Sequence, residues 1–178
     1  QPRWVVVPDV VTDSKATFKM WDEWAPIVAE KGFPLAFAVQ DGMTPEMVKA
    51  SNVEAEVIFV GGSTDFKWNT LTSWTDNFPR VHVGRVNGLR DLMRCHRRGV
   101  ESCDGTGFFR GRRAQLGELI TYLAIVAREY MTILSSIRPM KNYYLISLVI
   151  EEPGVYDSEH QRRLAAAIHP MLRCHTAR

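Results

Sequence analysis

The sequence predicts an α/β fold in which a parallel β-sheet is covered by helices. Short apolar runs alternate with longer stretches of helical periodicity through the first two thirds of the 178 residues. The apolar runs are continuous rather than alternating, which is typical of strands that are buried on both faces. Hydrophobic residues make up 46% of the chain and charged residues 24%, a balance that indicates a globular protein with one substantial core.

Five strands are expected, each closed by turn-forming residues. Pro8-Asp9 follows the first, Gly61-Gly62 the third and Gly84 the fourth. The expected strands, in chain order, are residues 4–7, 35–39, 57–60, 81–83 and a short one ending at 103–104.

Helix signals lie between these strands. Asp13 or Ser14 can cap a first helix that Gly32 stops. The string Thr-Pro-Glu at 44–46 starts a second, with a capping hydroxyl, a first-turn proline and an early acid. A helix or irregular segment is expected over about 66–77, and Asn87 is expected to cap a fourth helix that stops at Gly99.

The pattern changes after residue 113. Residues 114–137 predict one long helix, 143–150 fit either a strand or the start of a buried helix, and 157–174 predict an amphipathic last helix. We therefore expect residues 1–113 to form the βα portion that carries the site. Residues 114–178 are expected to form a mainly helical extension packed on it.

Charge and cysteine usage narrow the classes of function. Between residues 85 and 113 there are eight arginines and three acidic residues, so this stretch is a candidate for meeting phosphate or simply a solvated basic face. Three cysteines without a Cys-x-x-Cys pair argue against a disulfide framework and indicate a reducing, cytoplasmic compartment. Cys95-His96 and Cys174-His175 make poor two-ligand sites because adjacent side chains point apart, so no metal is expected.

No membrane partner is expected, because no apolar run approaches the ~20 residues that span a bilayer. The sequence begins at Gln1 with neither an initiator methionine nor a signal-peptide pattern, and it enters the first strand almost directly. This start predicts either processing or a preceding segment.

The ends of the expected strands carry the candidate site. Ligands bind at the carboxyl ends of parallel strands, where the loops vary and the strands hold them rigidly. Asp9 and Gln40 offer donors and acceptors for the edge of a flat heterocycle, and Gly61-Gly62 lets backbone N–H groups approach a ligand closely. Asp104 is a candidate nucleophile toward a sugar carbon; alternatively, it caps the next helix or pairs with Arg110 or Arg112.

These strand ends also carry a family resemblance, over about residues 4–107. The strings are Val-Pro-Asp-Val-Val at 7–11, Ala-Val-Gln-Asp-Gly at 38–42, Phe-Val-Gly-Gly-Ser-Thr at 59–64, Val-His-Val-Gly-Arg-Val-Asn at 81–87 and Gly-Val-Glu-Ser-Cys-Asp-Gly-Thr at 99–106. In this order and spacing they resemble the tRNA-guanine transglycosylase superfamily. The nearest branch is the phage and bacterial one that resembles DpdA, its DNA-directed member.

The resemblance implies a (β/α)8 barrel of the TIM type that exchanges guanine for a 7-deazaguanine base such as preQ0. It makes Asp104 the nucleophile that attacks C1′ of the target nucleoside, Asp9 and Gln40 the base-recognising residues, and Gly61 with Gly62 the backbone lining of the base pocket. We expect Lys67, Arg85 and Arg110 to form a basic rim for the nucleic-acid backbone. No cofactor is expected, because the deazaguanine is a substrate.

Two elements of the family are not in this sequence. One is an earlier acidic segment that supplies a general acid/base aspartate, and the other is the zinc-binding element of the tRNA enzymes. The second difference favours DNA over tRNA as the target. Five visible strands suggest part of a barrel, completed in a homo-oligomer or by another segment or chain.

Two other hypotheses remain open. The chain could be a non-catalytic nucleic-acid-binding or assembly subunit that keeps the pocket. It could also be an unrelated barrel lyase or hydrolase that uses Asp9 and Asp104 as an acid/base pair.

Overall fold

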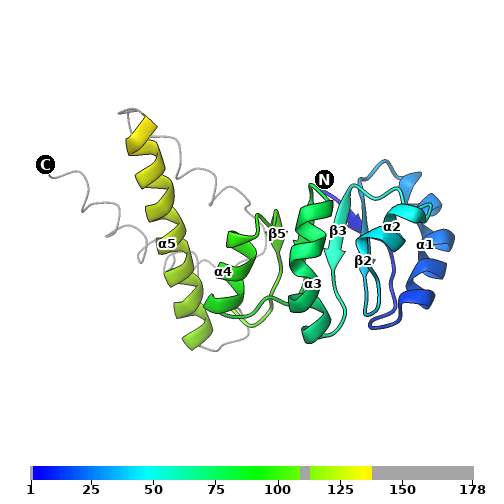
Figure 1. The fold of residues 1–178 in the computed structure, drawn as a ribbon, viewed down its shortest axis with the longest axis horizontal. Coiled ribbons are helices and arrows are strands. Elements are labelled where there is room, and N and C mark those ends of the chain that lie inside the picture. The colour runs from blue at the N-terminus through cyan, green and yellow to red at the C-terminus, as the bar shows by residue number, and fades with distance from the viewer. Residues whose placement is uncertain (1, 109–112, 138–178) are drawn as a thin grey trace, which may run out of the picture. The chain divides into compact units, whose positions relative to one another are not determined.

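The structure is a computed structural model that describes residues 2–108 and 113–137. The chain divides into two compact units, Gln1–Arg112 and Arg113–Arg178. The first unit carries strands β1–β5 and helices α1–α4, and the described part of the second is the helix α5 (Arg113–Ile137) (Figure 1). The elements expected at 143–150 and 157–174 lie outside the described residues. Across the described ranges, no helix has the length and apolar character needed to cross a membrane.

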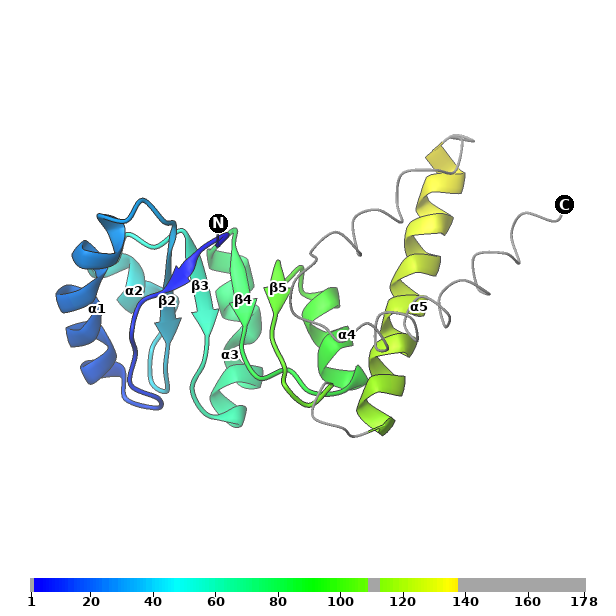
Figure 2. The same cartoon turned by 180° about the vertical axis from the view of Figure 1, so that it is seen from behind.

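The first unit is built on a single parallel sheet, which confirms the predicted α/β class. Its strands pair in chain order and are all parallel, and Figure 2 shows them side by side. Parallel neighbours need crossover connections, and the helices supply them. The strands are β1 (Val5–Val6), β2 (Leu35–Val39), β3 (Val57–Val60), β4 (Val81–Val83) and β5 (Ser102–Cys103).

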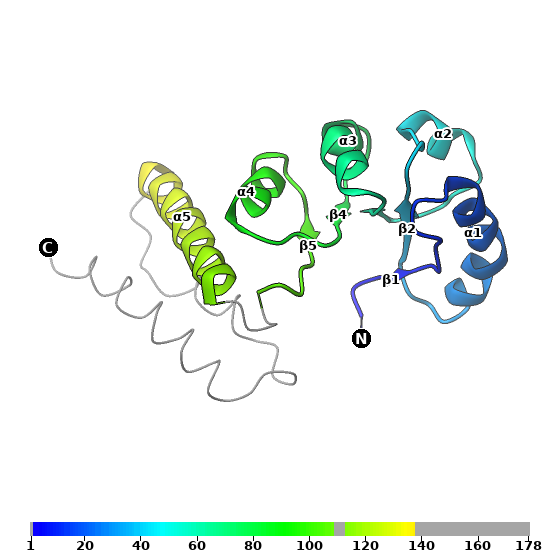
Figure 3. The same cartoon turned by 90° about the horizontal axis from the view of Figure 1, so that it is seen from below.

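The sheet is curled into a half-barrel, and its helices lie on the outer face (Figure 3). The hydrophobic core lies between the sheet and these helices. The ring centroid of Phe37 on β2 is 5.3 Å from that of Phe18 and 5.2 Å from that of Trp21, both on α1. The helices are α1 (Ser14–Ala29), α2 (Pro45–Ala50), α3 (Thr64–Asn77) and α4 (Leu89–Arg97).

The inner face of the sheet carries an aromatic cluster. Successive side chains of a strand point to opposite faces, so Phe59, which pairs with Ala38, lies on the face opposite Phe37. His82 pairs with Phe59 in register and stacks on it at 4.8 Å between ring centroids. The ring of Trp4 lies 4.8 Å from His82 on another side. A histidine is therefore held between two aromatic rings on the inner face.

Side-chain caps start the first three helices. Asp13 accepts the N–H of Ala16 at 2.9 Å, and Thr44 accepts that of Met47 at 3.3 Å, as predicted. Ser63 accepts the N–H of Phe66 at 3.2 Å, so α3 begins two residues earlier than the expected 66.

The predicted cap of the fourth helix is wrong. The N-cap of α4 is Gly88, at φ 109°, and no side chain caps it. The side chain of Asn87 instead accepts the N–H of Gly107 at 2.9 Å. Gly107 lies in the loop after β5, which runs past Asn87 here. Because the N–H of Gly107 donates to the Asn87 amide oxygen, that oxygen does not cap α4. Asn87 therefore ties together the two loops that follow β4 and β5.

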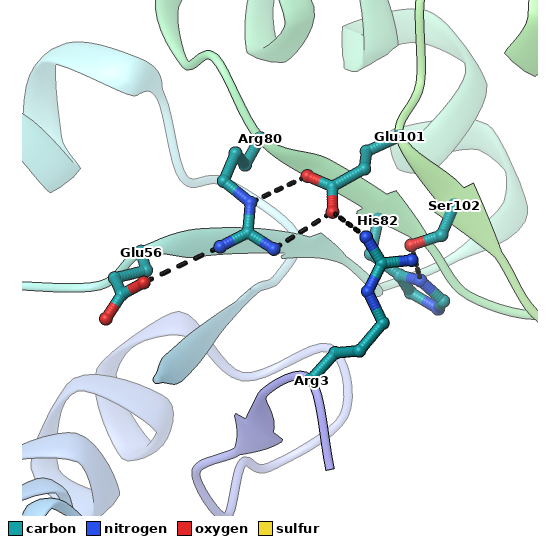
Figure 4. A network of polar contacts seen from close by, with 6 residues as sticks. All are labelled: Arg3, Glu56, Arg80, His82, Glu101 and Ser102. Carbon is teal, nitrogen blue, oxygen red and sulfur yellow. Dashed lines mark hydrogen bonds and ion pairs between the residues drawn. The ribbon is translucent and has the colours of Figure 1, made fainter. Parts of the chain in front are cut away.

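Ion pairs join the amino ends of four strands (Figure 4). Glu101, just before β5, accepts from Arg80 Nε at 2.7 Å and Nη2 at 2.9 Å, and from Arg3 at 3.4 Å. Arg80, just before β4, also lies 3.5 Å from Glu56, which precedes β3. The network lies at the edge of the sheet opposite the strand ends that carry the candidate site.

Replacing Glu101 by glutamine should lower the free energy of unfolding by about 1 kcal/mol near neutral pH, because the charge-assisted pair with Arg80 is only partly exposed. The Arg80 guanidinium lowers the pKa of Glu101. The contribution of Glu101 is therefore present above its unfolded pKa, about 4.3, and is lost as the pH falls through the lower folded pKa. Urea unfolding of both proteins at about pH 7 and pH 3 should show the difference shrink in acid.

Glu56→Gln is the matched control, since Glu56 is 60% exposed and makes one contact with Arg80 at 3.5 Å. Its effect should be smaller at both pH values. Equal losses in the two variants would contradict a special role for the Arg80–Glu101 pair.

Candidate functional site

The carboxyl edge of the sheet gathers the residues that the sequence singled out there. Gln40, Gly61, Gly84 and Asp104 each directly follow a strand, and Asp9 lies three residues after β1. Because the strands are parallel and in chain order, these positions share one edge. A line of contacts runs along it from Asp9 to Asp104.

The line begins with Asp9 and Gln40. Gln40 Nε2 donates to Asp9 Oδ2 at 2.6 Å, and its Oε1 accepts the N–H of Thr12 at 2.9 Å. Gln40 is 1% exposed, and burial raises the pKa of Asp9. The structure thus brings the two expected base-recognising residues together. The Gln40 amide is already hydrogen-bonded within the protein through both its nitrogen and its oxygen. Direct contact of either with a base stays a prediction.

The glycine pair comes next and fits tightly. A Cβ on Gly61 would lie 3.0 Å from Gln40 Nε2. Gly62 has φ +67°, and a Cβ there would lie 2.5 Å from Asp41 Oδ2. Asp41 also accepts the N–H of Ser63 at 2.7 Å and the Ser63 hydroxyl, so it fixes the turn after β3. Glycine is required here for the close approach of the two loops.

Asp104 is the half-exposed carboxylate at the far end of this line. Its side chain is 50% exposed. Oδ1 accepts the N–H of Arg85 at 3.0 Å, and Oδ2 lies 3.1 Å from His82 Nε2. The hydrogen bond from His82 is the largest cause that lowers the pKa of Asp104, and the N–H of Arg85 acts in the same direction against partial burial. Asp104 is therefore ionised at neutral pH, oriented and open to solvent.

A strained turn after β4 presents that N–H group to Asp104. Arg85 has φ 57°, a left-handed conformation that is uncommon outside glycine. Its guanidinium donates to the carbonyl of Gly62, which links the loops after β3 and β4. The expected rim residue thus also shapes the site, and its contact with phosphate stays a prediction.

The structure corrects the expected position of Lys67. The residue is 2% exposed, and its ammonium donates to the carbonyl of Gly84 at 2.5 Å and to that of Arg85 at 3.5 Å. Burial lowers its pKa. Lys67 does not lie on an exposed rim because the helical spacing of α3 places it with Leu71 and Trp74 on the buried face. Its hydrogen bonds to these two carbonyls stabilise the Gly84–Arg85 turn.

Lys67→Met should lower the free energy of unfolding by about 1–2 kcal/mol, because the Gly84 carbonyl loses its donor in a buried place. The loss is limited because the variant no longer buries a charged ammonium group, and removing that group from water costs free energy. Chemical denaturation measures it. Lys19→Met is the control, since Lys19 is exposed on α1 and its change should stay within about 0.5 kcal/mol. A neutral Lys67→Met would contradict the supporting role.

Two residues behind Asp104 were missed from the sequence: His82, which contacts it, and Ser102, which contacts His82. His82 and Ser102 lie within strands, and their side chains meet because β4 and β5 pair with these two residues in register. His82 Nδ1 lies 2.9 Å from Ser102 Oγ. A polar residue in the middle of the apolar run Val-His-Val was the available signal, but its partner depends on the register.

Other expected or possible sites contribute less. Arg110 lies outside the described residues. Within the part of the chain that the structure describes, no three His, Cys, Asp or Glu side chains could hold a metal ion. A cavity of about 350 Å³ lies beside α1, away from the carboxyl edge. It is lined by Trp21, Asp22, Ala25, Pro26, Ala29, Leu35, Asn52 and Glu54.

The chain was compared with protein-family models, with curated proteins and with solved structures, and none of them matches it.

Proposed function

We propose that the chain carries the site of a base-exchange glycosyltransferase, which replaces guanine in nucleic acid by a 7-deazaguanine base. The observation that carries this proposal is the state of Asp104. A carboxylate that is ionised, 50% exposed and bonded through both oxygens is suited to attack an electrophilic carbon. The choice of substrate rests on the resemblance of the strand-end strings to the transglycosylase superfamily.

In the proposed reaction, an Asp104 oxygen bonds to C1′ of the target nucleoside as the bond from C1′ to the guanine nitrogen breaks. Guanine leaves with the electron pair of that bond and takes up a proton from water. The incoming 7-deazaguanine, deprotonated at its ring nitrogen, then bonds to C1′ and releases the Asp104 carboxylate. Asp9, Gln40 and the backbone of Gly61 and Gly62 are proposed to hold the two bases in turn.

We further propose DNA rather than tRNA as the target, with the base turned out of the stack to reach Asp104. Arg85 is the candidate for backbone contact among the described residues, and Arg110 remains a candidate outside them. The half-barrel is compatible with part of a TIM-type barrel. Further strands, from another segment or another copy, would complete it.

The test is to trap the covalent intermediate. Incubation with guanine-containing DNA, without any deazaguanine, followed by denaturation, should give protein whose mass is raised by the bound DNA strand. In a parallel sample that is not denatured, labelled preQ0 should enter the DNA and release the protein. If the mass stays that of the free protein and no label enters DNA, the proposal fails. Salt-sensitive DNA binding without an adduct would favour the non-catalytic binding subunit.

A second candidate function is supported by one observation. Burial raises the pKa of Asp9, whereas the hydrogen bond from His82 lowers that of Asp104. Asp9 and Asp104 share the carboxyl edge of the sheet, and two carboxyl groups with pKa values pushed apart can act there as general acid and general base, as a lyase or hydrolase requires. This candidate predicts no stabilisation by guanine on heating, whereas base exchange predicts some.

A further inference from the structure

His82 is a buried polar side chain whose two ring nitrogens both have partners. It is 6% exposed, in the middle of a strand whose neighbours are valines. The ring of Phe59 stacks on it and that of Trp4 meets it edge-on, each with its centroid at 4.8 Å. A buried imidazole with an unpaired nitrogen would be destabilising. Here Nδ1 meets Ser102 and Nε2 meets Asp104, so the ring has one defined orientation.

The direction of each hydrogen bond follows from the ionisation of Asp104. An ionised carboxylate can only accept, so His82 Nε2 must carry a hydrogen and donate it to Oδ2. In the neutral imidazole, Nδ1 then accepts the hydroxyl hydrogen of Ser102. The Asp104 carboxylate therefore selects the tautomer, and the Ser102 hydroxyl, which can donate or accept, holds the ring in place at Nδ1.

We propose that His82 is a positioning residue for the nucleophile: oriented by Ser102 and by two aromatic rings, it fixes the rotation of the Asp104 carboxylate through a single N–H donor. The inference rests on the proposed function. Asp104 acts as the anion, so His82 donates a hydrogen bond and transfers no proton. The N–H of Arg85 holds the other oxygen, and together the two donors leave the carboxylate one orientation.

The same three residue types form the triad of serine hydrolases, in which serine attacks. Two observations favour the carboxylate as the reacting group. Ser102 lies within β5, whereas Asp104 follows the strand at the carboxyl edge, where ligands bind in parallel sheets. The described partners of Asp104 also leave half of its side chain exposed.

Two substitutions at one position separate the two hydrogen bonds of His82. The amide nitrogen of glutamine reaches close to the place of Nε2, so His82→Gln keeps a donor for Asp104. The shorter side chain of asparagine reaches the place of Nδ1, so His82→Asn keeps a partner for Ser102 and loses the donor to Asp104. Both remove the same aromatic contacts with Trp4 and Phe59, and both should destabilise the fold to a similar extent.

The measurements are the single-turnover rate of adduct formation with guanine-containing DNA, the Kd for that DNA, and the pKa of Asp104 by ¹³C NMR. We expect His82→Asn to slow the adduct about 100-fold and His82→Gln no more than about 10-fold, with Kd unchanged. The pKa of Asp104 should rise in His82→Asn only. Ser102→Ala should lie between the wild type and His82→Asn in rate.

Equal rates in the two His82 variants would overturn the inference while the proposed function stands. Covalent labelling of Ser102 by a fluorophosphonate would overturn it in favour of the serine triad. If the wild-type protein forms no adduct, the proposed function fails. In that case, the pKa of the Asp104 carboxyl alone tests whether His82 donates a hydrogen bond to it. An unchanged Asp104 pKa in His82→Asn would refute that interaction.

Discussion

Asp104→Asn should abolish formation of the covalent adduct, with a loss of at least about 10³-fold in the rate of base exchange. The amide has no anionic oxygen to bond to C1′, and no described carboxylate occupies an equivalent position after β5. The size of the side chain is unchanged, and an amide oxygen can still accept the N–H of Arg85. The loss should therefore be chemical rather than structural.

The decisive measurement is the mass of the protein after reaction with guanine-containing DNA. The affinity for that DNA should change little, because the substitution leaves the basic residues in place. Asp76→Asn, on the exposed face of α3, is the matched control and should react as the wild type does. An Asp104→Asn protein that still forms the adduct would identify a different nucleophile and end the proposal.

The second large effect is expected from Gly105→Ala. A Cβ on Gly105 would lie 1.8 Å from the carbonyl oxygen of Val86 and 3.1 Å from Phe108. The first neighbour is backbone, which cannot rotate away as a flexible side chain would. It is also tied down, since the N–H of Val86 donates to the carbonyl of Asp104 at 2.6 Å. The two loops must separate to admit a single methyl group.

We expect Gly105→Ala to lower the free energy of unfolding by about 2–4 kcal/mol. It should also move Asp104, which directly precedes Gly105 and whose carbonyl accepts the N–H of Val86. Urea denaturation measures the first effect, and the rate of adduct formation in conditions where the variant remains folded measures the second.

Gly117→Ala provides a control of opposite sign. No heavy atom lies within 4 Å of a Cβ built on Gly117 in α5, and alanine is the better helix former by about 0.5–1 kcal/mol. This variant should be as stable as the wild type or more so. If both alanines had the same effect, the close approach at Gly105 would not be the cause.

The sequence was enough to predict the sheet and the edge that gathers the candidate residues. Continuous apolar runs separated by helical periods give parallel strands, and parallel strands bring Asp9, Gln40 and Asp104 to one edge without any knowledge of register. The caps at Asp13 and Thr44 were also predictable, because they depend on local hydrogen bonds alone.

What holds Asp104 could not be predicted in the same way. His82 meets Ser102 only because β4 and β5 pair in one register, and a shift of one residue would turn His82 to the opposite face. The side chain of Asn87 accepts the N–H of Gly107 instead of capping the fourth helix, and Lys67 is buried although lysine is usually exposed. Each depends on a segment distant in sequence, which local patterns do not contain.

The amide of Arg85 has an unusual acceptor for a residue beside a strand, because its hydrogen bond ends on a side-chain carboxylate rather than on a sheet carbonyl. Its solvent hydrogen exchange is therefore governed by Asp104 instead of by opening of the sheet. An isotope-exchange experiment on this single backbone position would report whether the carboxylate is free or esterified. The turn after β4 thus provides a built-in reporter of the proposed nucleophile.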